Sequence, residues 1–373
     1  MIGVLAANDG TATNPDVQTA AGLMRVTGRN VGNLAFWYTA RRLFDEEVTF
    51  IPWKTAGTSL PKGLKAFVIP AANFIGTHSN LAPITEIVRE LDLPVAIFGL
   101  GAQSERDDVI PPVSENVKEF LVEVSSRTPF VGVRGDYSAK VCRALGADNV
   151  EILGCPSVLM NSDRNLGKTV ATKMKELVPT SVAVHAACRK GNLASVEREL
   201  VRLSLLNRGS SYIVQRPPEL IAAMYRETLG PQDAAYFGEV AGFLNMSVQD
   251  LTDYLLQYGH VPTSVPSWQV YLKRFSCSIN TRIHGTMIAF QSGIPSLCVV
   301  HDTRTRELAS TLRLPHLETT KFIEHRYDLK QMFNATNFDP VAFESRRSEV
   351  AGRYVSLFRE LGLKPSRHLN SFL

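Results

Sequence analysis

Short apolar runs alternate with longer amphipathic stretches along the whole chain. In the first half, the runs that resemble strands lie at residues 48–51, 66–69, 95–99, 130–133 and 150–153. The amphipathic stretches between them lie at 33–44, 81–91, 114–126 and 137–145. Runs that are apolar throughout are typical of parallel strands covered on both faces. The rhythm therefore predicts an α/β fold built on a doubly wound parallel sheet.

A second series of the same kind follows a polar segment, 160–172, which we interpret as a linker. Its strands are predicted at 182–185, 212–215, 276–279 and 296–300. Its helices are predicted at 193–206, 219–228, 247–258, 285–292 and 304–312, and one long helix at 341–361. A chain of 373 residues agrees with two domains of roughly 100–200 residues each.

The two series predict two Rossmann-like domains that face a cleft. We place the first domain at 1–165 and the second at 170–340. The remaining segment, 341–373, is expected to pack its helix back on the first domain. In such folds, ligands bind at the carboxyl ends of the strands.

Charge and cysteine content exclude several classes of protein. The net charge of +4 comes from 40 basic and 36 acidic residues that are dispersed along the chain, unlike the basic stripe of a nucleic-acid-binding protein. No apolar run reaches the roughly 18 residues of a membrane helix, and the N-terminus lacks a secretory pattern. The five cysteines are widely spaced and form no CxxC pair, which predicts reduced thiols and no zinc site. We therefore expect a cytoplasmic protein.

The strongest candidate site is the segment 277–286, CSINTRIHGT, in which a strand ends in a polar cluster and a helix follows. Free N–H groups at the start of that helix attract an anion. Arg282 adds donors that suit a phosphate or carboxylate, His284 adds a group that titrates near neutral pH, and Gly285 lets a ligand approach the backbone. The alternatives are that Arg282 binds a neighbouring carbonyl and that His284 is a buried structural histidine.

The next strand ends in His301 and Asp302, and a helix that begins with basic residues follows. Asp302 is expected to cap this helix, and His301 is either a ligand or a surface residue. Arg304 is a better ligand candidate than Arg306, because it lies nearer the strand end.

In the first half, the loop 27–33, TGRNVGN, precedes an apolar helix. Its glycines and asparagines form a phosphate-sized loop, and Asn30 and Asn33 are its candidate binding residues. It matches neither the dinucleotide-binding nor the P-loop pattern. A plain turn with Asn33 as the helix cap is equally compatible.

Three further strand ends carry polar residues. Gln103 closes the run FGLGAQ, Arg134 begins the turn RGDYS, where Asp136 is expected to cap a helix, and Arg216 follows a strand of the second half. A doubly wound fold gathers strand ends on one rim, so we expect these side chains to share one cleft.

Four features in chain order resemble the polysaccharide pyruvyltransferases. They are NVGN at 30–33, FGLGAQ at 98–103, RGDYS at 134–138 with GCP at 154–156, and RIHG at 282–285 with GIP at 293–295 and HD at 301–302. The similarity spans roughly residues 25–315. The chain has Asn33 where the family usually has Asp, Cys155 where it has Asp before proline, and Ile283 where Leu is common.

The resemblance implies a GT-B-like fold and the transfer of a pyruvyl group from phosphoenolpyruvate to a saccharide or lipid-linked oligosaccharide. A ketal forms and phosphate leaves, in exopolysaccharide or cell-surface glycan biosynthesis. The first domain would be the acceptor side and the second the donor side. No cofactor and no metal are expected, and an oligomer is possible.

Under this resemblance, His284 and Arg282 are the catalytic candidates. His284, as imidazolium, would protonate the methylene carbon of the donor, and Arg282 would hold the donor and neutralise the departing phosphate. Asp302 or Asp136 would deprotonate the acceptor. The substrate-binding candidates are Arg134, Arg216, Gly285, Asn30, Asn33, Gln103, His301, Asp302 and Arg304.

Two alternatives stay open. One is a nucleotide-sugar glycosyltransferase of the GT-B fold, for which Glu307 and Glu318 are the available carboxylates. The other is a non-catalytic member of the family that binds a glycan.

Overall fold

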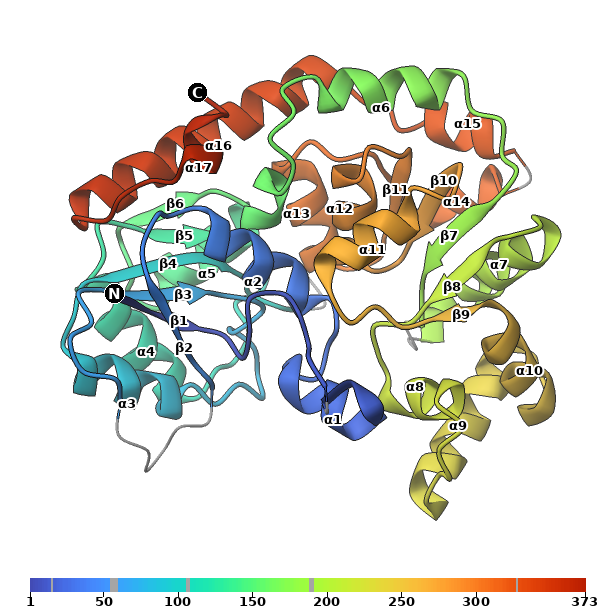
Figure 1. The fold of residues 1–373 in the computed structure, drawn as a ribbon, viewed down its shortest axis with the longest axis horizontal. Coiled ribbons are helices and arrows are strands. Elements are labelled where there is room, and N and C mark those ends of the chain that lie inside the picture. Colours follow the sequence, from blue (N-terminus) through green and yellow to red (C-terminus); the bar gives the residue numbers. More distant parts are fainter. Residues whose placement is uncertain (15, 54–59, 105–107, 188–190, 327) are drawn as a thin grey trace.

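The computed structural model describes residues 1–14, 16–53, 60–104, 108–187, 191–326 and 328–373. It contains two α/β domains, each built around a six-stranded parallel sheet (Figure 1). The predicted fold class, two Rossmann-like doubly wound domains of GT-B-like type, is confirmed.

The first sheet has the strand order β2-β1-β3-β4-β5-β6. Its strands are β1 (Ile2–Leu5), β2 (Val48–Ile51), β3 (Phe67–Pro70), β4 (Val95–Leu100), β5 (Val131–Val133) and β6 (Val150–Ile152). Its helices are α1 (Ala20–Val26), α2 (Asn33–Arg42), α3 (Ala82–Leu91), α4 (Glu115–Ser125) and α5 (Asp136–Ala144). Short 3₁₀ turns, η1 (Asp16–Gln18) and η2 (Pro156–Leu159), lie before α1 and after β6.

The second sheet has the order β12-β11-β10-β7-β8-β9. If β7 is counted as the first strand of this sheet, the order read from the β9 edge is the Rossmann order 3-2-1-4-5-6. Its strands are β7 (Val182–His185), β8 (Ser211–Ile213), β9 (Gly259–His260), β10 (Cys277–Asn280), β11 (Ser296–Val300) and β12 (His316–Glu318). The strand order reverses between β7 and β10, which is where such sheets bind ligands.

Ten helices and one 3₁₀ turn belong to this half of the described chain. They are α6 (Leu166–Lys175), η3 (Gly191–Leu193), α7 (Ala194–Leu206), α8 (Pro218–Met224), α9 (Pro231–Leu244), α10 (Val248–Tyr258), α11 (Val265–Leu272), α12 (Ile283–Gln291), α13 (Thr303–Thr311), α14 (Thr319–Glu324) and α15 (Leu329–Asn334).

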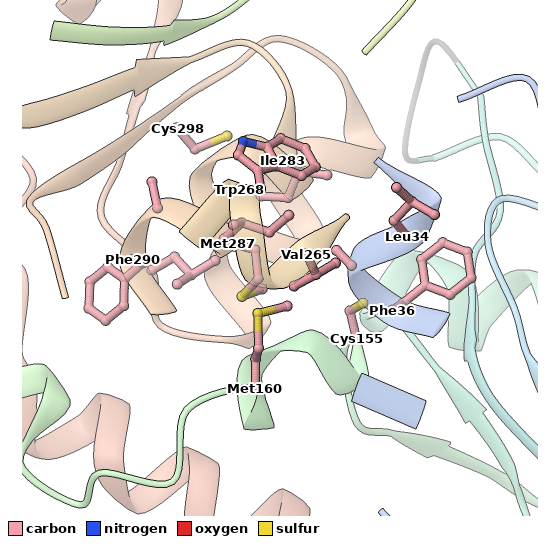
Figure 2. Close-up of a cluster of buried hydrophobic side chains, with 14 of the residues drawn as sticks. Leu34, Phe36, Cys155, Met160, Val265, Trp268, Ile283, Met287, Phe290 and Cys298 are labelled. Atoms are coloured by element: carbon pink, nitrogen blue, oxygen red, sulfur yellow. The ribbon is translucent and has the colours of Figure 1, made fainter. Parts of the chain in front are cut away.

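A continuous apolar core joins the two domains. Leu34 and Phe36 of α2 belong to the same buried cluster as Met160, which follows η2, and Met287 of α12. Figure 2 shows these side chains together with Cys155, which lies at the start of η2. The domains are therefore held against each other by apolar contact as well as by the chain that links them.

The long C-terminal helix α16 (Pro340–Glu360) lies along both domains, followed by the short helix α17 (Arg367–Asn370) (Figure 1). The ring of Tyr354 is 5.1 Å from that of Phe98 in β4. Arg347 is buried and donates hydrogen bonds to the carbonyl oxygens of Val158 and Asp163, on the segment between the domains. The domain boundaries at 165 and 170 stay a prediction.

The predicted linker 160–172 is wrong over its second half, because Leu166–Lys175 form helix α6. Leu166, Val170 and Met174 are four residues apart and buried, so they form one apolar stripe. The carboxylate of Glu344 in α16 accepts a hydrogen bond from the N–H of Gly167 at 2.6 Å, which stabilises the helix start. The polar composition of the segment hid this pattern.

Candidate functional site

Arg134 is the residue of the first domain at the centre of the site. It follows β5 and is only 2% exposed. Its Nε donates to the carbonyl oxygen of Gly99 at 2.9 Å and its Nη1 to Oδ1 of Asn73 at 2.5 Å. Its Nη2 is buried and has no hydrogen-bond partner among the described residues. A buried donor without an acceptor is costly, so Nη2 is a candidate to bind an acceptor atom of a ligand.

His284 approaches Arg134 from the second domain. It is the second residue of α12 and 6% exposed. Its Nε2 lies 3.8 Å from Sγ of Cys155, and its ring centre lies 5.4 Å from that of Phe36. Burial, followed by the charges of Arg134 and Arg304, lowers the pKa of His284 to about 3. The imidazole is therefore neutral near pH 7, and an anion bound beside it would raise its pKa.

Arg304 lies near the same imidazole at the start of α13. Asp302 caps this helix, as predicted, by accepting from the N–H of Thr305 at 2.8 Å. The other carboxylate oxygen, Oδ2, lies 3.1 Å from Nη2 of Arg304 and 3.7 Å from Nε2 of His301. The side chain of His301 is 1% exposed, so the surface alternative for it is wrong. Asp302 therefore both starts the helix and orients Arg304.

Arg282 lies at the neighbouring strand end, and the structure does not place it against the imidazole of His284. Its Nε donates to the carbonyl oxygen of Ala186 at 3.1 Å, and its Nη2 donates to that of Ala187. This is the arrangement that the carbonyl-binding alternative describes. Its role in holding a donor stays a prediction.

Gly285 is explained by a residue that the sequence did not single out. A Cβ on Gly285 would lie 2.3 Å from Cγ of His185, the last residue of β7. Trp268 donates from Nε1 to Nε2 of His185 at 3.2 Å, so the imidazole proton is on Nδ1, facing Oδ1 of Asn280 at 2.5 Å. Burial lowers the pKa of His185 to about 3. A neutral, fixed ring thus supports the turn that carries His284.

The loop 27–33 contacts the second domain through its backbone, and the binding roles of Asn30 and Asn33 stay predictions. The N–H of Val31 donates to the carbonyl oxygen of Gln215 at 3.1 Å. Asn30 accepts from the N–H of Gly32 at 3.1 Å, and Asn33 donates to the carbonyl oxygen of Thr27 at 2.9 Å. The alternative that Asn33 caps α2 is wrong, because Gly32 occupies that position.

Gln103 and Arg216 are exposed at the ends of β4 and β8. The structure brings neither into contact with Arg134, His284 or Arg304 through any hydrogen bond between described residues. Their binding roles stay predictions.

The start of α5 is held by a carboxylate from the other domain. Asp136 is the first residue of α5 and its side chain does not cap the helix, contrary to prediction. Instead, Glu307 of α13 accepts from the N–H of Ser138 at 3.0 Å and from its Oγ at 2.6 Å. Burial raises the pKa of Glu307. The other carboxylate of the glycosyltransferase alternative, Glu318, pairs with Arg306 at 2.7 Å.

The candidate site thus joins Arg134 of the first domain with His284 and Arg304 of the second, and the carboxylates of Asp302 and Glu307 lie beside the two arginines. It suits a small ligand with more than one negative group. Cys155 was noted only as a departure from the family pattern and Glu307 only as a carboxylate of the glycosyltransferase alternative, so the contacts of both were not predicted. Among the described residues, no three His, Cys, Asp or Glu side chains converge as metal ligands would.

The family model described as polysaccharide pyruvyl transferase matches residues 30–303 of this chain. A comparison with curated proteins finds no match. None of the helices in the described ranges is both long and apolar enough to cross a bilayer.

Three solved structures are similar in arrangement. The UDP-GlcNAc 2-epimerase of Neisseria meningitidis bound to UDP-GlcNAc is 14% identical, with 79% of this chain and 76% of that chain covered and a TM-score of 0.39. The S. aureus MnaA–UDP co-structure is 11% identical, with 98% and 99% covered and a TM-score of 0.42. A variant of the wall teichoic acid polymerase TagF is 9% identical, with 88% and 84% covered and a TM-score of 0.39.

Proposed function

The chain belongs to the polysaccharide pyruvyl transferase family, and from that premise we propose that it transfers the pyruvyl group of phosphoenolpyruvate to a saccharide. The product is a pyruvate ketal, and inorganic phosphate is released. The acceptor is a saccharide or a lipid-linked oligosaccharide of exopolysaccharide or cell-surface glycan biosynthesis. The observation that carries the choice of donor is the buried Nη2 of Arg134, which has no hydrogen-bond partner among the described residues.

Phosphoenolpyruvate carries a phosphate and a carboxylate on a three-carbon skeleton. Arg134 and Arg304 come from different domains and both act electrostatically on His284, so an anion bound beside that ring would be attracted by both. Each charge-assisted hydrogen bond would contribute about 1.5–3 kcal/mol. We therefore assign the donor mainly to these two arginines.

Arg282 is the second candidate for the donor. To bind phosphoenolpyruvate, the guanidinium of Arg282 would have to break its hydrogen bonds to the carbonyl oxygens of Ala186 and Ala187. Arg304 needs no such movement, because its pairing with Asp302 leaves further N–H groups available.

The reaction begins with proton transfer to carbon. Donor binding raises the pKa of His284, and the resulting imidazolium gives its proton to the methylene carbon of the enol. A cationic centre develops at the carbon that carries the phosphate, and an acceptor hydroxyl oxygen forms a bond to it. The hydroxyl proton passes to a base, for which the exposed Asp136 is a better candidate than the engaged Asp302.

The carbon–oxygen bond to phosphate then breaks, and its electron pair leaves with the phosphate. Arg134 and Arg304 stabilise the departing charge. A second acceptor hydroxyl adds to the same carbon and loses its proton, which closes the ketal.

A cytoplasmic setting is part of the proposal. The four cysteines of the described ranges, Cys142, Cys155, Cys277 and Cys298, are free and buried, and Cys188 lies outside those ranges. Free thiols are typical of reducing compartments.

The test is to incubate the protein with phosphoenolpyruvate and candidate saccharides and to follow phosphate release. Release that depends on the acceptor, with a ketal in the product, is the expected result. Turnover of a UDP-sugar without release of phosphate from phosphoenolpyruvate would overturn the proposal.

A further inference from the structure

Helix α13 of the second domain carries two groups that face the first domain. Arg304 lies in its first turn near His284, and Glu307 follows three residues later. Residues three apart lie on the same side of a helix. The helix that brings a donor-binding arginine to the site therefore also brings a carboxylate across the domain boundary.

Glu307 is bound to the first domain through Ser138. One carboxylate oxygen accepts from the N–H of Ser138 at 3.0 Å, and the other accepts from its Oγ at 2.6 Å. Glu307 has no ion-pair partner among the described residues. Its charged form is favoured by the two hydrogen bonds from Ser138 at the amino end of α5 and by the charge of Arg134.

Helices α13 and α5 are closely packed at Gly135. A Cβ on Gly135, the residue before α5, would lie 2.8 Å from Oε2 of Glu307 and 2.9 Å from Oγ1 of Thr311. The two helices therefore meet at one defined separation, and Gly135 is required for it.

The same serine connects this contact to Arg134. The Oγ of Ser138 accepts from the N–H of Ala102, which follows β4, at 3.0 Å. The preceding residue, Gly101, lies so close to Arg134 that a Cβ there would be 2.7 Å from Cδ of the arginine. A series of contacts thus runs from Glu307 through Ser138 and Ala102 to Gly101, which packs against the side chain of Arg134.

We propose that Glu307 is a positioning residue that joins the domains at the separation where Arg134 and Arg304 contact one donor molecule. It does not touch the donor itself. This inference rests on the proposed function, because the donor is the ligand whose capture it assists. Without the carboxylate, α13 loses its hydrogen bonds to the start of α5, so Arg304 is no longer held at a fixed position relative to Arg134 although the apolar core still joins the domains.

The experiment compares Glu307→Gln, Glu307→Ala, Ser138→Ala and the double variant of both alanine changes. Glu318→Gln is the matched control, because that carboxylate forms an exposed ion pair with Arg306 of the same helix. Each protein is tested for KM and kcat with phosphoenolpyruvate. Small-angle scattering with and without phosphoenolpyruvate measures the compactness of each.

We expect Glu307→Ala to raise the KM for phosphoenolpyruvate about tenfold with a smaller change in kcat, whereas the control changes neither. The radius of gyration should stay that of the unaltered protein in every variant, because the apolar core still joins the domains. Glu307→Gln keeps an acceptor oxygen, so its KM should lie between that of the control and that of Glu307→Ala. The loss in the double variant should be smaller than the sum of the two single losses, because both changes remove the hydrogen bond between Ser138 and Glu307, although Ser138→Ala also removes the acceptor of the Ala102 N–H.

Two results would overturn the inference. One is fully additive loss in the double variant, which would mean that Glu307 does not act through Ser138. The other is tighter binding of phosphoenolpyruvate by Glu307→Ala, which would mean that the Glu307 carboxylate competes with the donor for the same binding site. If the unaltered protein binds phosphoenolpyruvate and turns it over, either result leaves the proposed function standing. If it does neither, the proposed function itself is wrong.

Discussion

The Nε2 atom of His284 lies 3.8 Å from the Sγ atom of Cys155, and this contact joins the two domains at the site. Burial lowers the pKa of the imidazole to about 3 and raises the pKa of the thiol. Both groups are therefore neutral near pH 7, and neither balances the charge of Arg134. Glu307 and Asp302 are the carboxylates of the described chain that lie near the arginines of the site, and both accept hydrogen bonds from other groups, so Nη2 of Arg134 still lacks an acceptor among the described residues.

Replacing the thiol by a carboxylate should block the ligand. In Cys155→Asp, the new carboxylate would pair with Arg134 and raise the pKa of His284. We expect the affinity for phosphoenolpyruvate, measured by calorimetric titration, to fall at least about tenfold. Cys155→Ser keeps the size without the charge and should bind nearly as well as the parent. Equal binding by both variants would show that the anion does not contact Arg134.

Binding of phosphoenolpyruvate should take up a proton. An anion beside His284 would raise the pKa of this histidine from about 3 towards neutral pH. The uncharged imidazole of the free protein would therefore gain a proton as the complex forms. Titrations at pH 7 in buffers of different ionisation enthalpy measure the number of protons taken up. In His284→Gln, the uptake due to the protein should vanish, and an unchanged uptake would contradict the assignment of the proton to His284.

The protein should lose stability in mild acid. His185 and His284 have pKa values of about 3 in the folded chain, against 6.5 for an ordinary histidine. Between these values the unfolded chain binds protons that the folded chain does not, so the free energy of unfolding falls as the pH decreases through this window. Each histidine contributes a slope of about 1.4 kcal/mol per pH unit. Urea unfolding between pH 7 and pH 5 checks this, and His284→Gln should show a shallower dependence than the parent.

The turn that carries His284 should not tolerate a side chain at Gly285. In Gly285→Ala, the new methyl group would meet the ring of His185 at 2.3 Å, and both residues are fixed by their surroundings. Overpacking of this kind costs about 1–3 kcal/mol and displaces the backbone. Thermal unfolding and turnover should both fall. Gly242→Ala is the matched control, because a Cβ there meets nothing within 4 Å, and a normal Gly285→Ala protein would contradict the tight contact.

The sheets could be predicted from the sequence because most of their strands are buried apolar runs. The predicted strands at 182–185 and 296–300 coincide with β7 and β11. The strands β9 and β12 were missed, because GH and HLE contain no apolar run. β1 was missed because a four-residue run at the chain start has no preceding element to mark it. Helix α6 was hidden by its polar composition.

The site could be predicted only as a set of strand ends. Arg134, His284 and Arg304 each follow a strand, so the fold class brings them to one rim. The direction of each guanidinium depends on tertiary contacts that the sequence does not show. Arg282 binds carbonyl oxygens although it lies two residues from His284. Glu307 was considered only as a ribose ligand, because its partner Ser138 is 169 residues away in the chain.

The most direct measurement of the central claim is a calorimetric titration of phosphoenolpyruvate into the unaltered protein, Arg134→Ala and Arg282→Ala. The unaltered protein should bind, and Arg134→Ala should bind at least about tenfold more weakly, because it removes the buried Nη2 that lacks a partner among the described residues. Arg282→Ala should lose less, because that guanidinium is engaged by carbonyl oxygens. Binding by Arg134→Ala that equals binding by the unaltered protein would contradict the account.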